Sequence, residues 1–380
     1  MNRLALIGLL AAAIPASVQA QNSIYGTRGL GFPARPLSAR SQALGGGSAM
    51  FDRASALNPA GATGFDRVTV SAVSATSFRE YSAAGVDVTG LRETRFPLGF
   101  IGGGIARSAF SFNLGFSTYT ERSFDLTTQD TVATPAGPVP VTDRIISDGG
   151  VVDVRAAIGW RAGASLGLGA ALHLMTGSSR VVARRDFDSD EFRSFEQRDV
   201  LSFRGTGFSA GVIWLLSDRV SVAASARVNG KLTSSLKDGS FQDITMPRML
   251  AGGILIGVLG NGRWMTTAKW RSWSRSAADL AASGSNAFDT WEVGSGLEFG
   301  TDPTGRGHFP LRVGVRYAQL PFSPTLEQPT EWNFAIGTGA MFAARRAIVD
   351  VALERFQRDG AGATERGWYL TIGITITPSQ

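Results

Sequence analysis

The sequence predicts an all-β protein, a 14-stranded antiparallel transmembrane β-barrel preceded by an N-terminal plug (hatch) segment. Three observations carry this prediction. Apolar residues alternate with small or polar ones after residue 65, the alternating segments are even in number, and short connections alternate with longer ones. A barrel strand has this two-residue period because one face meets lipid and the other meets the lumen. An even number of antiparallel strands closes without an unpaired edge in the lipid.

The alternation is clearest where Phe110, Phe112, Leu114 and Phe116 are separated by small or polar residues. Each such segment has about the ten residues that a tilted spanning strand needs. The fourteen predicted strands span residues 66–78, 96–106, 109–121, 150–161, 164–182, 197–216, 219–233, 246–259, 262–275, 287–300, 308–320, 331–342, 346–358 and 366–378.

The connections agree with a barrel whose periplasmic turns are short and whose outer loops are longer. Short links are expected at 107–108, 162–163, 217–218, 260–261 and 343–345, with a somewhat longer one at 301–307. The intervening connections are mostly longer, and the longest is the predicted outer loop 122–149, which shows no amphipathic helix.

Tryptophans gather at membrane interfaces because their rings are amphipathic. The predicted strands place Trp160, Trp214 and Trp264 at inner ends and Trp291, Trp332 and Trp368 at outer ends, all on the lipid-facing side. Trp270 and Trp273 fit this arrangement less well. A soluble β-sandwich with buried tryptophans does not predict such sorting.

The first residues have the pattern of a secretory signal, with Arg3, an apolar run from Leu4 to Ile14 and small residues before Gln21. We therefore expect a cleaved signal peptide at 1–20, the plug at 21–65 and the barrel at 66–380, located in a bacterial outer membrane.

The composition suits a membrane barrel, because 43% of the residues are apolar and only 18% are charged. The formal charge of +6 comes from scattered residues and forms no basic stripe, so we expect contact with outer-membrane lipid and lipopolysaccharide and no nucleic-acid partner. The chain has no cysteine, which excludes disulfides and thiolate metal sites. We expect no metal and no cofactor.

The segment 43–61 lacks the alternation and is the expected plug. Gly45, Gly46 and Gly47 allow backbone conformations closed to other residues. Asp52 is expected to cap a short helix that runs through Leu57. Pro59 restricts Asn58 to extended geometry and is expected to end that helix. We assign plugging and ligand gating to Gly45, Gly46, Gly47, Asp52, Asn58 and Pro59.

Charged residues also occupy the predicted lumen side of the strands. Their mixed signs let them neutralise one another and hold a plug. The set consists of Asp153, Arg155, Lys269, Arg271, Glu292, Glu298, Arg312, Arg316, Asp350 and Glu354.

The plug segment resembles the start of the FadL/TodX family of long-chain fatty-acid and hydrocarbon outer-membrane transporters. The resemblance rests on the glycine run, Asp52 and the run Asn58-Pro59-Ala60-Gly61. Later stretches are similar as well: Met246-Pro247, Trp270-Arg271-Ser272-Trp273-Ser274, and the strand from Leu311 to Pro321.

The resemblance implies a barrel closed by an N-terminal hatch, with hydrophobic small molecules captured at the outer face and released sideways into the membrane. PorV-like barrels of a protein-secretion system share the glycine-rich and Asn-Pro-Ala opening. A structural or secretion role with an exported protein partner is therefore the alternative to passive transport.

We also consider a membrane-embedded hydrolase. The chain has only two histidines, His173 and His308, and neither has a serine nucleophile motif or a paired carboxylate in the sequence around it. We therefore expect no enzyme activity.

Overall fold

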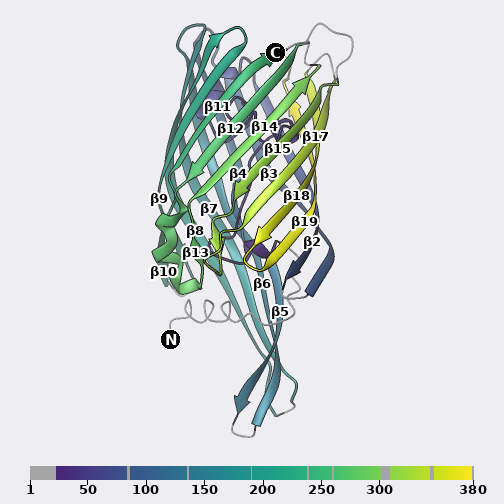
Figure 1. Cartoon of the computed structure of the whole chain (residues 1–380). Coiled ribbons are helices and arrows are strands. Elements are labelled where there is room, and N and C mark those ends of the chain that lie inside the picture. Colours follow the sequence, from purple (N-terminus) through teal and green to yellow (C-terminus); the bar gives the residue numbers. More distant parts are fainter. Residues whose placement is uncertain are drawn as a thin grey trace.

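The computed structural model describes residues 23–83, 86–134, 137–189, 191–237, 239–258, 261–300, 309–342 and 346–378. The predicted signal peptide 1–20 and His308 lie outside the described residues. The chain forms a closed antiparallel barrel of 14 strands (Figure 1). These strands are β2 (Thr69–Ala83), β3 (Val86–Gly104), β4 (Phe110–Glu121), β6 (Gly137–Arg161), β7 (Leu166–Phe187), β8 (Phe195–Ser217), β9 (Val220–Ser235), β11 (Met249–Val258), β12 (Gly262–Arg271), β14 (Thr290–Phe299), β15 (Leu311–Gln319), β17 (Thr330–Phe342), β18 (Ala347–Gly360) and β19 (Ala363–Ile376).

The first and last barrel strands close the wall. β19 pairs with β2 over a continuous register from Ala363 opposite Ala83 to Ile376 opposite Val70. Each of the fourteen predicted strands overlaps one observed barrel strand, so the predicted fold class is confirmed. We call the end of the barrel at residues 105–109 and 162–165 the turn end, and the end at Ala83 and residues 361–362 the loop end.

The outer face is apolar, as the alternation predicts. Leu114 and Phe116 of β4 are 51% and 46% exposed, while Asn113 between β4's apolar residues is buried. The six tryptophans predicted to face lipid are exposed on the outer face: Trp160, Trp214, Trp264, Trp291, Trp332 and Trp368. Trp273 differs, because β12 ends at Arg271 and the indole is fully buried near the loop end.

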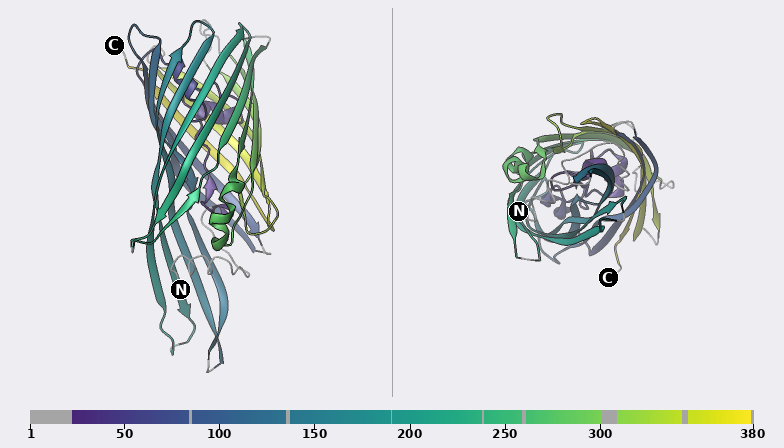
Figure 2. Two further views of the ribbon diagram at one scale, coloured as in Figure 1. Left: turned by 90° about the vertical axis from the view of Figure 1, so that its left-hand side faces the viewer. Right: turned by 90° about the horizontal axis from the view of Figure 1, so that it is seen from below.

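The prediction that residues 122–149 form a loop is wrong. These residues form β5 (Phe124–Thr134), which pairs with the first half of β6. These strands are rich in Thr and Val and lack the apolar face of the barrel strands, and Gly137 at the start of β6 has a φ of +123°. The extended β6, β7 and β8 continue this hairpin into a sheet that projects beyond the loop end (Figures 1 and 2).

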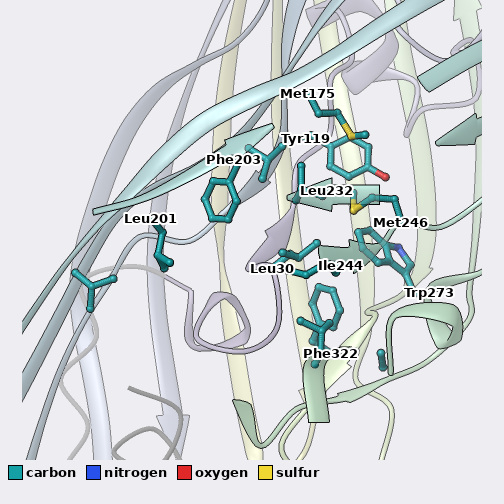
Figure 3. Close-up of a cluster of buried hydrophobic side chains, with 14 of the residues drawn as sticks. Leu30, Tyr119, Met175, Leu201, Phe203, Leu232, Ile244, Met246, Trp273 and Phe322 are labelled. Atoms are coloured by element: carbon teal, nitrogen blue, oxygen red, sulfur yellow. The ribbon is translucent and has the colours of Figure 1, made fainter. Parts of the chain in front are cut away.

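Short elements cover part of the loop end. They are β10 (Phe241–Thr245), η3 (Trp273–Ser276), α3 (Ala277–Leu280), η4 (Ala281–Ser283), β13 (Asn286–Ala287) and β16 (Phe322–Ser323). Trp273, Met246 and Phe322 from this region pack with Leu30 and with Met175 and Leu232 of the wall (Figure 3). We call this group the loop-end cluster. Among the described residues, no helix is long and apolar enough to cross a membrane.

The plug runs through the lumen from the loop end to the turn end, and Figure 2 shows it enclosed by the wall. Its elements are η1 (Ile24–Gly26), β1 (Phe32–Pro33), α2 (Ala39–Ala43) and η2 (Pro59–Gly64). The tyrosine hydroxyl of Tyr25 donates to the carbonyl of Ala363 at the loop end. At the other end, η2 packs against β6, β7 and β8.

The prediction of a helix from Asp52 through Leu57 is wrong, since this stretch forms turns. The helix in this part of the plug lies after it and begins at Pro59. Pro59 is the first residue of η2, a position where its missing N–H costs nothing. Asn58 is extended, as expected before proline, and its side chain accepts a hydrogen bond of 3.0 Å from the Ala60 N–H.

An arginine placed on the outer face tests the position of the membrane. Leu114 lies between the tryptophan levels, so Leu114→Arg is expected to lower the free energy of unfolding by about 2–4 kcal/mol. Phe195 is equally exposed, but it begins β8 in the projecting sheet. Phe195→Arg is therefore expected to cost less than about 0.5 kcal/mol. Urea unfolding of both variants in lipid vesicles measures the difference, and equal losses would contradict this placement.

Candidate functional site

The plug is seated on the wall by direct backbone contact at Leu44 and Gly45. A Cβ added to Gly314 would lie 2.1 Å from the Leu44 carbonyl carbon, and one added to Gly294 would lie 2.1 Å from the Gly45 oxygen. Gly45 itself has a φ of +59°, which a side chain would strain. The Thr267 hydroxyl donates to the Gly47 carbonyl at 2.8 Å. Glycines on both sides thus let the two backbones meet.

Two plug arginines bind carboxylates of the wall. Arg40 of α2 contacts Glu298 at 2.6 Å, and Arg35 contacts Glu354 at 2.8 Å. Glu298 also contacts Arg312, which in turn contacts Asp350 at 2.7 Å. Burial alone would lower the pKa of the Arg40 guanidinium, but the hydrogen bonds and charge of Glu298 raise it. The plug is therefore held by charges that stay ionised.

Three further contacts fix the stretch between Asp52 and Asn58. Asp52 accepts hydrogen bonds from the Ser38 hydroxyl and, at 2.9 Å, from the Ala54 N–H. The Asn58 amide donates to the Met50 carbonyl of the plug and, at 3.3 Å, to the Val212 carbonyl of the wall. Arg155 donates to the Ser55 carbonyl at 3.0 Å. Asp52 thus holds a turn, and Asn58 and Arg155 join the plug to the wall.

A chain of alternating charges crosses nine barrel strands toward the loop end. We call it the charge belt. Five of its members, Arg79, Arg316, Arg358, Glu331 and Glu365, are buried, and neighbouring members are in ion-pair contact. In order, the belt runs through Lys269, Glu292, Arg316, Glu331, Arg358, Glu365, Arg79, Glu93, Arg95 and Glu121. Each inner charge has an opposite charge on both sides, so the set is neutral.

The predicted lumen charges fall into distinct groups. Lys269, Glu292 and Arg316 belong to the belt, while Glu298, Arg312, Asp350 and Glu354 belong to the plug contacts above. Arg271 lies over the ring of Tyr119 at 5.7 Å. The sequence reasoning missed the plug partners Arg35 and Arg40. It also missed the belt members at the strand ends, which lie outside the clearest alternation.

The barrel wall has a seam between β3 and β4. The ladder that joins them runs from Gly104 opposite Ser111 to Leu98 opposite Ser117, and among the described residues no pairing joins them beyond that point. β3 continues on its other side with β2 as far as Val86. The next residue after Leu98 in this direction is Pro97, which has no N–H to donate, so the ladder ends there.

The end of β4 stays paired with β6 as far as Glu121 opposite Gly150, and on its other side it meets the plug instead of β3. Thr120 and Glu121 pair with Pro33 and Phe32 of the plug strand β1. The ring of Tyr119 lies 6.1 Å from that of Trp273, which follows β12 on another part of the wall. Across the seam, Arg95 of β3 contacts Glu121 at 2.7 Å. Side chains therefore close the wall where the backbone ladder stops.

Three cavities lie along the plug. One of about 70 Å³ lies inside the seam and is lined by Phe32, Pro97 and Glu121 among others. A second, of about 40 Å³, lies beside Tyr119, Leu37 and Gly45. The third is about 680 Å³ and lies at the turn end, lined by Arg53, Phe51 and Met341 among others. The seat of the plug separates the turn-end cavity from the other two.

The structure corrects the expectation that His173 has no paired carboxylate. His173 Nδ1 lies 2.9 Å from Asp153, and Nε2 lies 2.8 Å from the Ser209 hydroxyl. Because a carboxylate only accepts, a neutral His173 donates to Asp153 and accepts from Ser209. Arg227 also contacts Asp153, and Ser209 is only 2% exposed. The group has the geometry of a triad, but Ser209 lines none of the three cavities, whereas Asp153 and Arg227 line the one beside Tyr119.

The seat of the plug can be loosened by one methyl group. In Gly314→Ala the added carbon overlaps Leu44, and because ladders on both sides hold β15, the plug must move. We expect higher ion conductance in planar bilayers than for the unaltered protein. Gly252→Ala is the matched control, since its nearest neighbour would lie at 3.8 Å. Unchanged conductance in Gly314→Ala would contradict this seat.

Serine reactivity tests the role of the group around His173. Since Ser209 is buried beside Asp153 and Arg227, we expect a fluorophosphonate probe to leave the folded protein unlabelled. Mass spectrometry of the treated protein measures this. Labelling that is lost in Ser209→Ala would contradict a purely structural role.

The comparisons with known proteins concern the fold. No protein-family model and no curated relative matches the sequence. Among solved structures, a Pseudomonas aeruginosa FadL homologue is similar with a TM-score of 0.60 and 13% identity, over 91% of this chain and 99% of that chain. The P. putida toluene transporter TodX has a TM-score of 0.59 and 13% identity, with coverages of 90% and 99%. The monoaromatic hydrocarbon channel CymD has a TM-score of 0.58 and 15% identity, with coverages of 90% and 98%. The chain therefore has the fold of the FadL-like and TodX-like channels.

Proposed function

We propose that the chain is a passive outer-membrane channel for hydrophobic small molecules, which enter at the loop end and leave sideways through the seam between β3 and β4. The seam carries this proposal. A closed barrel satisfies every backbone group within its wall, and a stretch without a ladder is tolerated in lipid only where other groups replace it. A wall interrupted at one place suits lateral release.

The entrance in this proposal is the loop-end cluster. It is apolar and contains Met175 and Met246, whose flexible side chains adapt to ligands of different shape. Tyr119 joins the cluster to the cavity beside Gly45, and it lies on the strand end that borders the seam. A ligand that displaces Tyr119 would therefore reach the seam by a short path.

The plug has the role of closing the straight path through the barrel. We assign this role to Gly45, Gly46, Gly47, Asp52, Asn58 and Pro59. A shift of the glycine turn would join the turn-end cavity to the cavity beside Tyr119. The backbone seat at Gly294 and Gly314 opposes such a shift.

The comparisons support this class of ligand. TodX is described as a toluene transporter and CymD as a monoaromatic hydrocarbon channel. Long-chain fatty acids and hydrocarbons are accordingly the ligand classes we propose. The barrel fold and the apolar outer face support an outer-membrane location, and such a location requires export, for which we propose the signal at 1–20.

Reversible cross-linking of the seam tests lateral release. The chain has no cysteine, so Arg95→Cys with Glu121→Cys provides a unique pair across the seam. A short reducible thiol cross-linker is expected to stop uptake of labelled toluene or fatty acid into cells, because it holds β3 to β4. Reduction of the cross-linker is expected to restore uptake.

The control is a pair at a continuous ladder. Glu80 and Arg366 form an exposed ion pair of 2.6 Å across β2 and β19. Cross-linking Glu80→Cys with Arg366→Cys is expected to leave uptake unchanged. Uptake that continues through a cross-linked seam would contradict lateral release, and equal uptake in cells with and without the gene would contradict transport altogether.

One observation favours the alternative role with an exported protein partner. Among the described residues β5 pairs only with β6, so in this part of the chain the projecting sheet has a free edge from Phe124 to Thr134. Free edges pair with other chains by adding a strand. A stoichiometric exported protein that co-purifies with the barrel, and is lost when residues 124–148 are replaced by a short turn, would favour this role.

A further inference from the structure

Two arginines near the loop end have no anionic partner within the part of the chain that the structure describes. Arg28 follows η1 in the plug and is only 6% exposed, and its Nη1 is buried without a hydrogen bond. Arg122 directly follows β4 and is half-buried, and its Nε is likewise buried without a partner. Neither guanidinium forms an ion pair with any described residue. The plug arginines Arg35 and Arg40, in contrast, each have a carboxylate.

The two arginines are brought together by one turn of the plug. The Gly31 N–H donates to the Arg28 carbonyl at 2.9 Å and closes the turn. A Cβ on Gly31 would lie 2.2 Å from the backbone carbonyl oxygen of Glu121 and 3.0 Å from the Arg122 Cα. The turn therefore packs directly against the end of β4. Gly31 has a φ of +95°, and glycine is therefore required both for the turn and for the close approach.

This arrangement leaves a buried cation, Arg28, near a second and half-buried cation, Arg122. Burial lowers the pKa of Arg28, and burial together with the charge of Arg28 lowers the pKa of Arg122. Arginine nevertheless stays protonated in proteins, so the charges persist. A buried charge without a partner is strongly destabilising, whereas a bound oxyanion would receive hydrogen bonds from both guanidiniums.

The surroundings of the two arginines are partly apolar. Leu30, two residues after Arg28, belongs to the loop-end cluster (Figure 3). Gly29 lies so close to Phe322 that a Cβ would be 2.6 Å from its ring. Two hydroxyls are near as well: Ser285 accepts from the Gly29 N–H at 2.9 Å, and Ser123 follows Arg122. The site thus joins a cationic side to an apolar side.

We propose that Arg28 and Arg122 bind the oxyanion head, a carboxylate or a phosphate, of an amphiphile whose apolar body lies against Leu30 and Phe322. The site deepens the proposed function and rests on it only for the physiological source of the ligand. Bound there, the amphiphile offsets the charge of the two cations and fastens the first turn of the plug to the strand end that borders the seam. A neutral hydrocarbon lacks the group that these arginines recognise.

Binding to the full-length protein in non-ionic detergent tests the site. The probes are dodecanoate, dodecyl phosphate, 1-dodecanol and inorganic phosphate, measured by calorimetry. We expect at least one anionic amphiphile to bind about tenfold or more tightly than 1-dodecanol, as hydrogen bonds to charged groups imply. Arg28→Gln and Arg122→Gln are each expected to remove that preference, and Arg28→Lys to restore part of it. Arg198→Gln, at an exposed arginine of the projecting sheet, is the control and is expected to bind like the unaltered protein.

A thermal readout separates this role from a structural one. Without ligand, Arg28→Gln removes a like-charge contact, so we expect an unfolding temperature equal to or above that of the unaltered protein. A clear drop would overturn the proposal, as would equal binding of 1-dodecanol and the anionic amphiphiles. Inorganic phosphate that binds as tightly as dodecyl phosphate would overturn the proposed contact between the apolar body of the ligand and Leu30 and Phe322. Uptake of neutral toluene by cells that carry the unaltered protein reports on the channel itself, whereas calorimetry reports on the anion site, so a failure of one is distinguishable from a failure of the other.

Discussion

The charge belt is the interaction on which the closed state of this barrel depends. Backbone ladders hold most of the wall, but at the seam the ladder stops and the pair Arg95–Glu121 is the contact that bridges it. That pair is not isolated, since Arg95 also contacts Glu93, and Glu93 contacts Arg79. Removing a buried member of the belt, such as Arg79, leaves an uncompensated charge, which costs about 3–5 kcal/mol. The partly exposed seam pair is therefore joined to a network whose buried members are costly to remove.

The plug fills the lumen, and the charge belt joins the strands around it. A 14-stranded barrel is too wide for its own side chains to fill. The plug fills it by placing its backbone against glycines of β14 and β15, and Arg40 with Glu298 adds a charged contact on the same side. Near the seam, the plug strand β1 replaces the missing neighbour of β4. The same segment thus blocks the axis of the barrel and supports its wall where the ladder between β3 and β4 is interrupted.

The barrel strands could be predicted from the sequence, but the contacts in the barrel interior could not. Strand number and lipid-facing residues follow from a two-residue period that lipid imposes on every strand, which is why Leu114 and Trp160 could be placed. The hairpin at 124–148 was mistaken for a loop because strands that leave the membrane no longer need an apolar face. The contacts among Asp153, His173 and Ser209 depend on the pairing of three strands, which no local pattern contains. One signal was available and unused: Pro97 interrupts an alternating strand, and proline in a strand predicts an unpaired edge.

The path of the plug has a consequence for how the molecule assembles. The plug precedes β2 in the chain, and β2 completes the wall only by pairing with β19, nearly three hundred residues later. Contacts between such distant segments form late, because a long loop must be closed before they stabilise anything. Until then the sheet is open on one side, and the plug can be laid against it from that side. The last register to form, between β19 and β2, then encloses a segment that is already in place, so the order of synthesis builds the obstruction before the pore.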